Sequence, residues 1–246
     1  MQSIGANPTN QPQGNNPQFS EREQKMTIKP RISKVSKLDG IKSWSLQAMD
    51  TCPGAKDSIT GKPVDACAMC YAYKVGNYNY PNVIEPRLQN QEAWKSPNFV
   101  GDMVSLIKNQ PFFRWFDSGD MYHIGLARKI LRIMELTPNT RHWMPTRMAK
   151  FAKFARVIDQ MNALPNVVVR FSSDSVLGEY QPGVHGSTII PTAEHATDDM
   201  SVCRAYENNG KCSGCRACWD KNTPIIAYVA HGAKAKKVIR LKLETA

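Results

Sequence analysis

The sequence lacks any hydrophobic run of 18 residues, the length that a membrane-spanning helix requires. It also lacks the apolar N-terminal region of a signal peptide, because its first residues are polar and rich in Asn and Gln. Such a segment cannot bury enough apolar surface to offset the entropy that it would lose on ordering. We therefore expect no membrane contact, a disordered tail over residues 1–24 and a single domain over residues 25–246.

Several common catalytic motifs are missing as well. The chain contains no HExxH pair, no Walker loop, no GxGxxG turn and no GxSxG elbow. These absences argue against a zinc hydrolase, a nucleotide-binding fold and a serine hydrolase.

Cysteine is the residue that the chain uses distinctively. It has seven, an odd number that a closed set of disulfides would not use, and no export signal precedes them. Disulfides do not persist in a reducing cytosol, where clustered cysteines are more often metal ligands. The cysteines fall into a three-Cys group, Cys52, Cys67 and Cys70, and a four-Cys group, Cys203, Cys212, Cys215 and Cys218.

The four-Cys group favours an iron–sulfur cluster. Its last three members are spaced by three residues, with the small residues Ser213, Gly214 and Ala217 among those between them. This spacing lets tight turns direct successive thiolates at one small object, as in the loops that hold cubane clusters. A structural zinc ion, which also takes four cysteines, is the alternative.

The three-Cys group leaves one ligand position undecided. If it holds a [4Fe–4S] cluster, one iron has no cysteine, and that iron is either open to water or substrate or closed by another side chain. The spacing also permits one cluster shared between the two groups, so the chain is expected to hold one or two.

Hydrophobic periodicity predicts alternating strands and helices. Apolar stripes with helical period indicate helices over 85–109, with a break at 96–97, and over 123–136 and 147–164. Strands are expected at 43–49, 112–116, 141–145, 166–172, 188–190 and 224–229, and an irregular segment at 203–219. This order is typical of parallel βαβ units.

Polar segments follow directly after several of these strands. They are the first cysteine loop, the segment 117–120, Thr146 with Arg147, and the segment 172–175. Because ligands bind at the carboxyl ends of parallel strands, we expect these segments to converge on one rim.

The chain carries a net charge of +11, concentrated in two stretches, residues 25–42 and 234–242. Such basic flanks either contact nucleic acid phosphates or form an ordinary solvated surface.

The stretch from Trp44 to Tyr71, the Ser-Gly-Asp after the second strand and the C-terminal CxxCxxCW together resemble the phage gene-product-88-like family, over residues 35–232. This resemblance implies a phage origin and a location in the cytoplasm of the infected bacterium. The two basic stretches would then contact nucleic acid or a phage protein.

A more distant resemblance is to the radical S-adenosylmethionine enzymes. It implies a partial (β/α)6 barrel with a cysteine-rich C-terminal extension, in which the three-Cys group follows the first strand and its open iron binds S-adenosylmethionine. Ser118, Gly119 and Asp120 would then hold the amino group of that cofactor. The match departs from the family's CxxxCxxC spacing, because fourteen residues separate Cys52 from Cys67. Asp120 also suits a simple helix N-cap.

Two hypotheses follow. In the first, the chain is a radical or redox enzyme that uses the three-Cys cluster. In the second, it is a non-catalytic iron–sulfur or zinc protein with a structural, redox-sensing or nucleic-acid-binding role.

Overall fold

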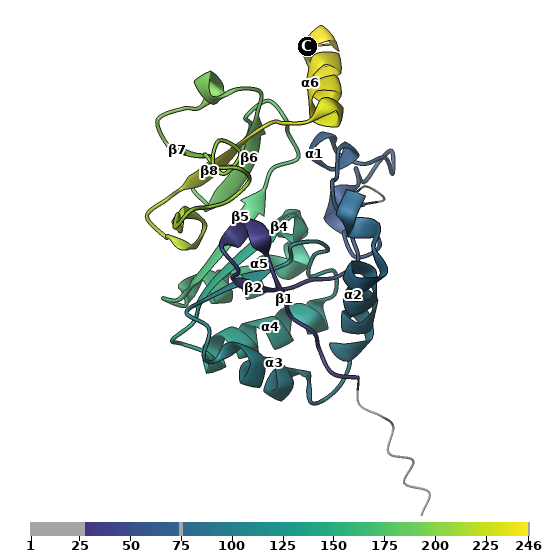
Figure 1. Cartoon of the computed structure of the whole chain (residues 1–246), viewed down its shortest axis with the longest axis vertical. Coiled ribbons are helices and arrows are strands. Elements are labelled where there is room, and N and C mark those ends of the chain that lie inside the picture. The colour runs from purple at the N-terminus through teal and green to yellow at the C-terminus, as the bar shows by residue number, and fades with distance from the viewer. Residues whose placement is uncertain (1–27, 74–75, 246) are drawn as a thin grey trace, which may run out of the picture.

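A single open sheet of eight strands organises the part of the chain that the structure describes. The computed structural model describes residues 28–73 and 76–245, so the predicted tail lies outside the described residues. The strands are β1 Ser33–Lys34, β2 Lys42–Trp44, β3 Phe112–Trp115, β4 Arg141–Thr146, β5 Val167–Ser172, β6 Gly186–Ile190, β7 Met200–Cys203 and β8 Ile225–Val229. The α-helices are α1 Asp65–Ala68, α2 Pro81–Ala93, α3 Phe99–Ile107, α4 Ile124–Leu136, α5 Ala152–Ala163 and α6 Ala233–Thr245 (Figure 1). None of the described helices is long and apolar enough to cross a membrane.

The strand order is β1-β2-β3-β4-β5-β6-β8-β7. Only β1 pairs antiparallel, and the other neighbours are parallel. The six predicted strands therefore stand next to one another in chain order, which confirms the parallel arrangement. The sheet is not closed, because β1 and β7 are its two edges, so the expected barrel is not confirmed.

One face of the sheet packs against α3, α4 and α5. The apolar stripe of α4 includes Leu126, Ile130 and Met134, which are fully buried, as the helical period predicts. These side chains join Trp44 and Trp115 from the strands in one core cluster. Helices α3 and α5 both contact α4, so the three helices form one layer.

The opposite face of the sheet carries the cysteine-rich loop. Alternate residues of a strand point to opposite faces, so Trp143 of β4 lies on this side. Trp143 packs against Leu38 and Trp219. The Trp219 indole Nε1 also donates to the Phe113 carbonyl at 3.0 Å, which seats the loop on the sheet.

Three elements differ from the sequence prediction. The strand β7 was not predicted and ends at Cys203, where the segment expected to be irregular begins, and the predicted first strand ends at Trp44. Helix α6 was not predicted. It packs through Ala235 and Ile239, the latter in one cluster with Ala66 of α1, so it lies beside the three-Cys group.

Candidate metal centres

The three-Cys group lies at the carboxyl end of β2. Cys52 follows a turn, Cys67 lies in α1, and the Cys70 N–H donates to the Cys67 carbonyl at 3.1 Å. Burial, together with the neighbouring Asp120, Cys67 and Cys70, raises the pKa of the Cys52 thiol to about 12. Burial also raises the pKa of Cys67, against the opposing charge of Arg147. Without a metal these two thiols are neutral.

Residues that follow β4 and β5 form hydrogen bonds with the loop that carries the three-Cys group. Lys150 Nζ donates to the Gly54 carbonyl at 2.9 Å, and the Ala66 N–H donates to the Asp174 carbonyl at 3.0 Å. Arg147 Nε lies 3.3 Å from Asp174 Oδ1. A Cβ on Gly54 would lie 2.7 Å from Arg147 Cβ, so this close approach requires glycine. The predicted convergence of these segments on one rim is confirmed.

The Ser-Gly-Asp segment lies at the same rim, with its polar groups engaged inside the protein. Ser118 Oγ donates to the Leu46 carbonyl at 2.6 Å. Gly119 has φ +77°, and a Cβ there would lie 2.6 Å from Leu46 Cβ. The segment therefore ties the end of β3 to the chain that leaves β2.

Asp120 makes the equivalent connection to β4. Its Oδ1 accepts from the Met121 N–H at 2.8 Å and from Thr146 Oγ1 at 2.7 Å, and its Oδ2 accepts from the Arg147 N–H at 2.9 Å. Burial raises the pKa of this carboxyl. A cofactor amino group would have to share an oxygen that already accepts a hydrogen bond.

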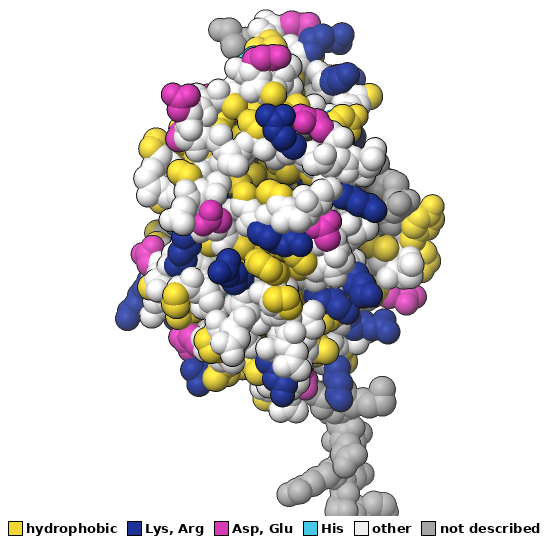
Figure 2. Space-filling view, turned by 60° about the vertical axis from the view of Figure 1, so that its left-hand side comes forward, with side chains coloured by type: hydrophobic (Ala, Val, Ile, Leu, Met, Phe, Trp, Pro, Cys, Tyr) yellow, Lys and Arg dark blue, Asp and Glu magenta, His cyan; other side chains and the backbone are white. Residues whose placement is uncertain are grey.

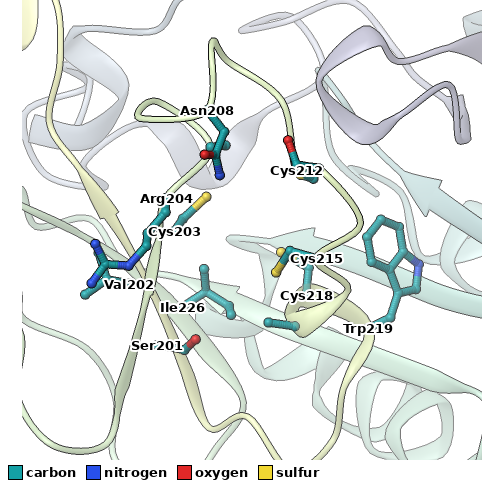
Figure 3. Close-up of a pocket in the computed structure, with 13 residues that line it drawn as sticks. Ser201, Val202, Cys203, Arg204, Asn208, Cys212, Cys215, Cys218, Trp219 and Ile226 are labelled. Carbon is teal, nitrogen blue, oxygen red and sulfur yellow. The ribbon is translucent and has the colours of Figure 1, made fainter.

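The four-Cys group surrounds one cavity. Cys203 ends β7, and the other three cysteines lie on the loop between β7 and β8. All four line a cavity of about 270 Å³. Figure 3 shows the Cys203 and Cys215 sulfur atoms on opposite sides of this space. The sequence grouped these residues correctly, although it did not predict the strand that positions Cys203.

The turn between Cys212 and Cys215 is held by Asp39. Its carboxylate accepts from the N–H groups of Ser213 and Gly214, at 3.2 and 3.0 Å, and from Arg216 Nη1 at 3.0 Å. Ser213 and Gly214 both have positive φ, at 49° and 87°, which this tight turn requires. A segment far away in the sequence thus shapes the loop.

The second half of the loop is held by Arg170 of β5, which is fully buried. Its guanidinium donates to five carbonyl oxygens at 2.9–3.0 Å, with all three nitrogens engaged. The acceptors belong to Ala217, Cys218, Asp220, Thr223 and Pro224. Sequence reasoning missed this residue, although an arginine inside the apolar run VVVRFS was a signal for a buried polar contact.

Two thiols of this group, Cys212 and Cys218, are also protonated in the absence of metal. Burial raises the pKa of Cys218 to about 11, and its Sγ lies 3.8 Å from the Tyr228 hydroxyl. Burial also raises the pKa of Cys212, with Cys203 and Cys215 as neighbours.

All seven cysteines are free thiols. Among the residues that the structure describes, no three or more His, Cys, Asp or Glu side chains are arranged to hold a single metal ion. His123 caps α4, because its Nδ1 accepts from the Gly125 N–H at 3.0 Å.

Comparison with known proteins gives one match. No curated protein and no solved structure matches this chain. The family model described as Gene product 88 matches residues 15–241, which is most of the sequence and includes both cysteine groups. The chain therefore belongs to the Gene product 88 family.

Proposed function

We propose that this protein binds iron–sulfur clusters at its two cysteine groups. The observation that carries the proposal is the 270 Å³ cavity lined by all four cysteines of the C-terminal group. A single zinc ion bound at about 2.3 Å from each sulfur needs far less room than this cavity offers, whereas a cubane cluster is a larger object. Hydrogen bonds from Arg170 and to Asp39 fix the backbone around the cavity, so the fold itself determines the shape of the cavity.

The three-Cys group is the candidate for chemistry. It lies at the rim formed by the carboxyl ends of parallel strands, where ligands bind in such sheets. The parallel, chain-order arrangement of β2 to β6 and β8 is a feature that this open sheet shares with the partial (β/α)6 barrel implied by the resemblance to radical S-adenosylmethionine enzymes. In this proposal the three cysteines hold a [4Fe–4S] cluster whose fourth iron takes a ligand other than cysteine. Such a cluster supplies an electron for radical or redox chemistry when it is bound.

Ser118, Gly119 and Asp120 act in this proposal by positioning the loop. Their contacts to Leu46, Thr146 and Arg147 favour that role over direct contact with S-adenosylmethionine. Substitution of Asp120 therefore changes cofactor binding only through the geometry of the cysteine loop.

Anaerobic purification with iron, sulfide and zinc analysis tests the proposal. Two cubane clusters give about eight iron per chain, and replacing either cysteine group by serine leaves about four. Electron paramagnetic resonance before and after addition of S-adenosylmethionine reports whether the three-Cys cluster binds it. Zinc in place of iron would overturn the proposal, and iron without a spectral response would leave a structural or redox role.

The second candidate is a nucleic-acid-binding metalloprotein. The exposed lysines of α6, Lys234, Lys236 and Lys237, favour it. In Figure 1, α6 lies at the top of the molecule and the first described residues lie at the bottom, while the rest of that basic stretch runs up to β1 and β2 in the middle. Figure 2 shows Lys and Arg side chains spread over one face, around a hydrophobic centre. A salt-dependent affinity for DNA that is lost when the three lysines become glutamine would favour this candidate.

A further inference from the structure

Two buried arginines share one carboxylate at the carboxyl end of β3. Arg114 Nη1 lies 2.9 Å from Asp117 Oδ1, and Arg87 Nη2, from α2, lies 3.8 Å from Asp117 Oδ2. The same carboxylate accepts a hydrogen bond from the Tyr78 hydroxyl at 3.0 Å. Two positive charges and one negative charge leave this cluster with a net charge of +1.

Neither arginine has its hydrogen-bonding capacity filled. Arg87 is 5% exposed and Arg114 is 9% exposed. Arg87 Nη1 and Arg114 Nε are buried and have no hydrogen-bond partner among the described residues. The contrast is Arg170, equally buried, with every nitrogen engaged by a carbonyl. Buried polar groups are nearly always paired, so two open donors on neighbouring cations point to a missing anion.

Aromatic rings hold the two guanidinium groups in place. The Arg87 guanidinium lies 4.6 Å from the centre of the Tyr78 ring, and that of Arg114 lies 4.7 Å from the centre of the Trp143 ring. Stacking on a ring fixes the plane of a guanidinium and leaves its edge free to donate. Tyr71, whose ring packs edge-on against Tyr78 at 5.3 Å, is 57% exposed.

We propose that Arg87 and Arg114 form a binding site for an oxyanion, the phosphate or carboxylate group of a small-molecule ligand. A singly charged oxyanion neutralises the cluster and accepts from both open donors, in the geometry for which arginine is suited. The site lies at the rim that also carries Cys70, a neighbour of Arg87. It is built from residues other than the cysteines, so it stands whether or not they hold iron.

Isothermal titration calorimetry of the full chain with inorganic phosphate, and separately with acetate, tests this site. We expect binding of at least one of them, and Arg87→Met weakens that binding by about tenfold or more, because a charge-assisted contact is lost. Asp117→Asn removes the competing carboxylate and tightens binding. The control, Arg132→Met, changes an exposed arginine on α4 that pairs with Glu135 and leaves binding unchanged.

The two anions distinguish the ligand class. Preference for phosphate indicates a phosphorylated ligand, and preference for acetate indicates a carboxylic acid. Tighter binding by Asp117→Asn keeps the test meaningful if Arg87→Met folds poorly, since loss of structure does not raise affinity. Failure of both anions to bind, or an affinity unchanged in Arg87→Met, overturns the proposal.

Discussion

Replacing Arg170 by methionine separates the two cysteine groups experimentally. Methionine fills much of the same volume but donates no hydrogen bond. The five carbonyl oxygens that Arg170 now engages, all within residues 217–224, would lose their donor. Arg170 belongs to neither cysteine group, and its hydrogen bonds do not involve the three-Cys loop.

The magnitude follows from those contacts. A buried carbonyl left without its donor costs at least about 1 kcal/mol, which gives about 5 kcal/mol for five. Removing a buried charge restores part of this, about 2 kcal/mol, because the guanidinium no longer has to be desolvated. The expected loss of unfolding free energy is thus about 3 kcal/mol. For a chain of this size that corresponds to a fall in Tm of roughly 6–12 °C.

Thermal unfolding and iron content together provide the assay. Arg170→Met should lower Tm as stated and reduce iron from about eight to about four per chain, because only the four-Cys loop is released. Arg156→Met, an exposed arginine on α5, is the matched control and should change neither quantity. A loss of stability below about 1 kcal/mol would refute the reasoning about the carbonyls. Equal loss of iron from both groups would refute the separation.

Three further predictions test the rim and the core. Asp120→Asn should lower the free energy of unfolding, measured in urea, by about 2 kcal/mol. The new amide N–H would face a backbone N–H that now donates a hydrogen bond to the carboxylate. An unchanged free energy of unfolding would contradict these contacts. Gly54→Ala should lower the free energy of unfolding by about 1–3 kcal/mol and release iron from the three-Cys group, because the new Cβ would lie 2.7 Å from Arg147 Cβ. A variant that retains this iron would contradict the prediction. Burial lowers the pKa of His142 from 6.5 to about 4. The unfolded chain therefore takes up a proton first, and stability falls by up to about 3 kcal/mol as the pH drops from 6.5 to 4. His142→Gln should flatten this pH dependence in urea titrations, and an unchanged slope would contradict it.

Local patterns predicted the regular elements of this fold well. The stripe that marks α4 and the valine run of β5 reflect burial on one or both faces, which sequence periodicity reports directly. The grouping of the cysteines was also visible, because the last three lie close together in the chain. Helix α6 was missed because its basic residues outweigh the few apolar positions that pack.

Contacts between distant segments were beyond the sequence. Asp39 binds Ser213 and Gly214, 174 and 175 residues away, and no local signal marks such a pair. The Ser-Gly-Asp segment is the clearest example at the site. The resemblance to radical S-adenosylmethionine enzymes suggested a cofactor contact for this segment. The same residues suit a buried junction between strands, and only the partners of Asp120 distinguish the two roles.

The protonation of the cysteines favours metal binding over nucleophilic catalysis. A thiol with a pKa of about 12, as in Cys52, is a thiolate in roughly one molecule in 10⁵ at pH 7, and Cys218 with a pKa of about 11 is little better. A nucleophilic cysteine needs the opposite environment, one that lowers the pKa. A metal ion displaces the thiol proton and neutralises the negative charge of the resulting thiolate. Metal binding can therefore overcome the cost of burying that charge. Buried thiols with raised pKa values, such as Cys52 and Cys218, are therefore poor nucleophiles and better suited to act as metal ligands.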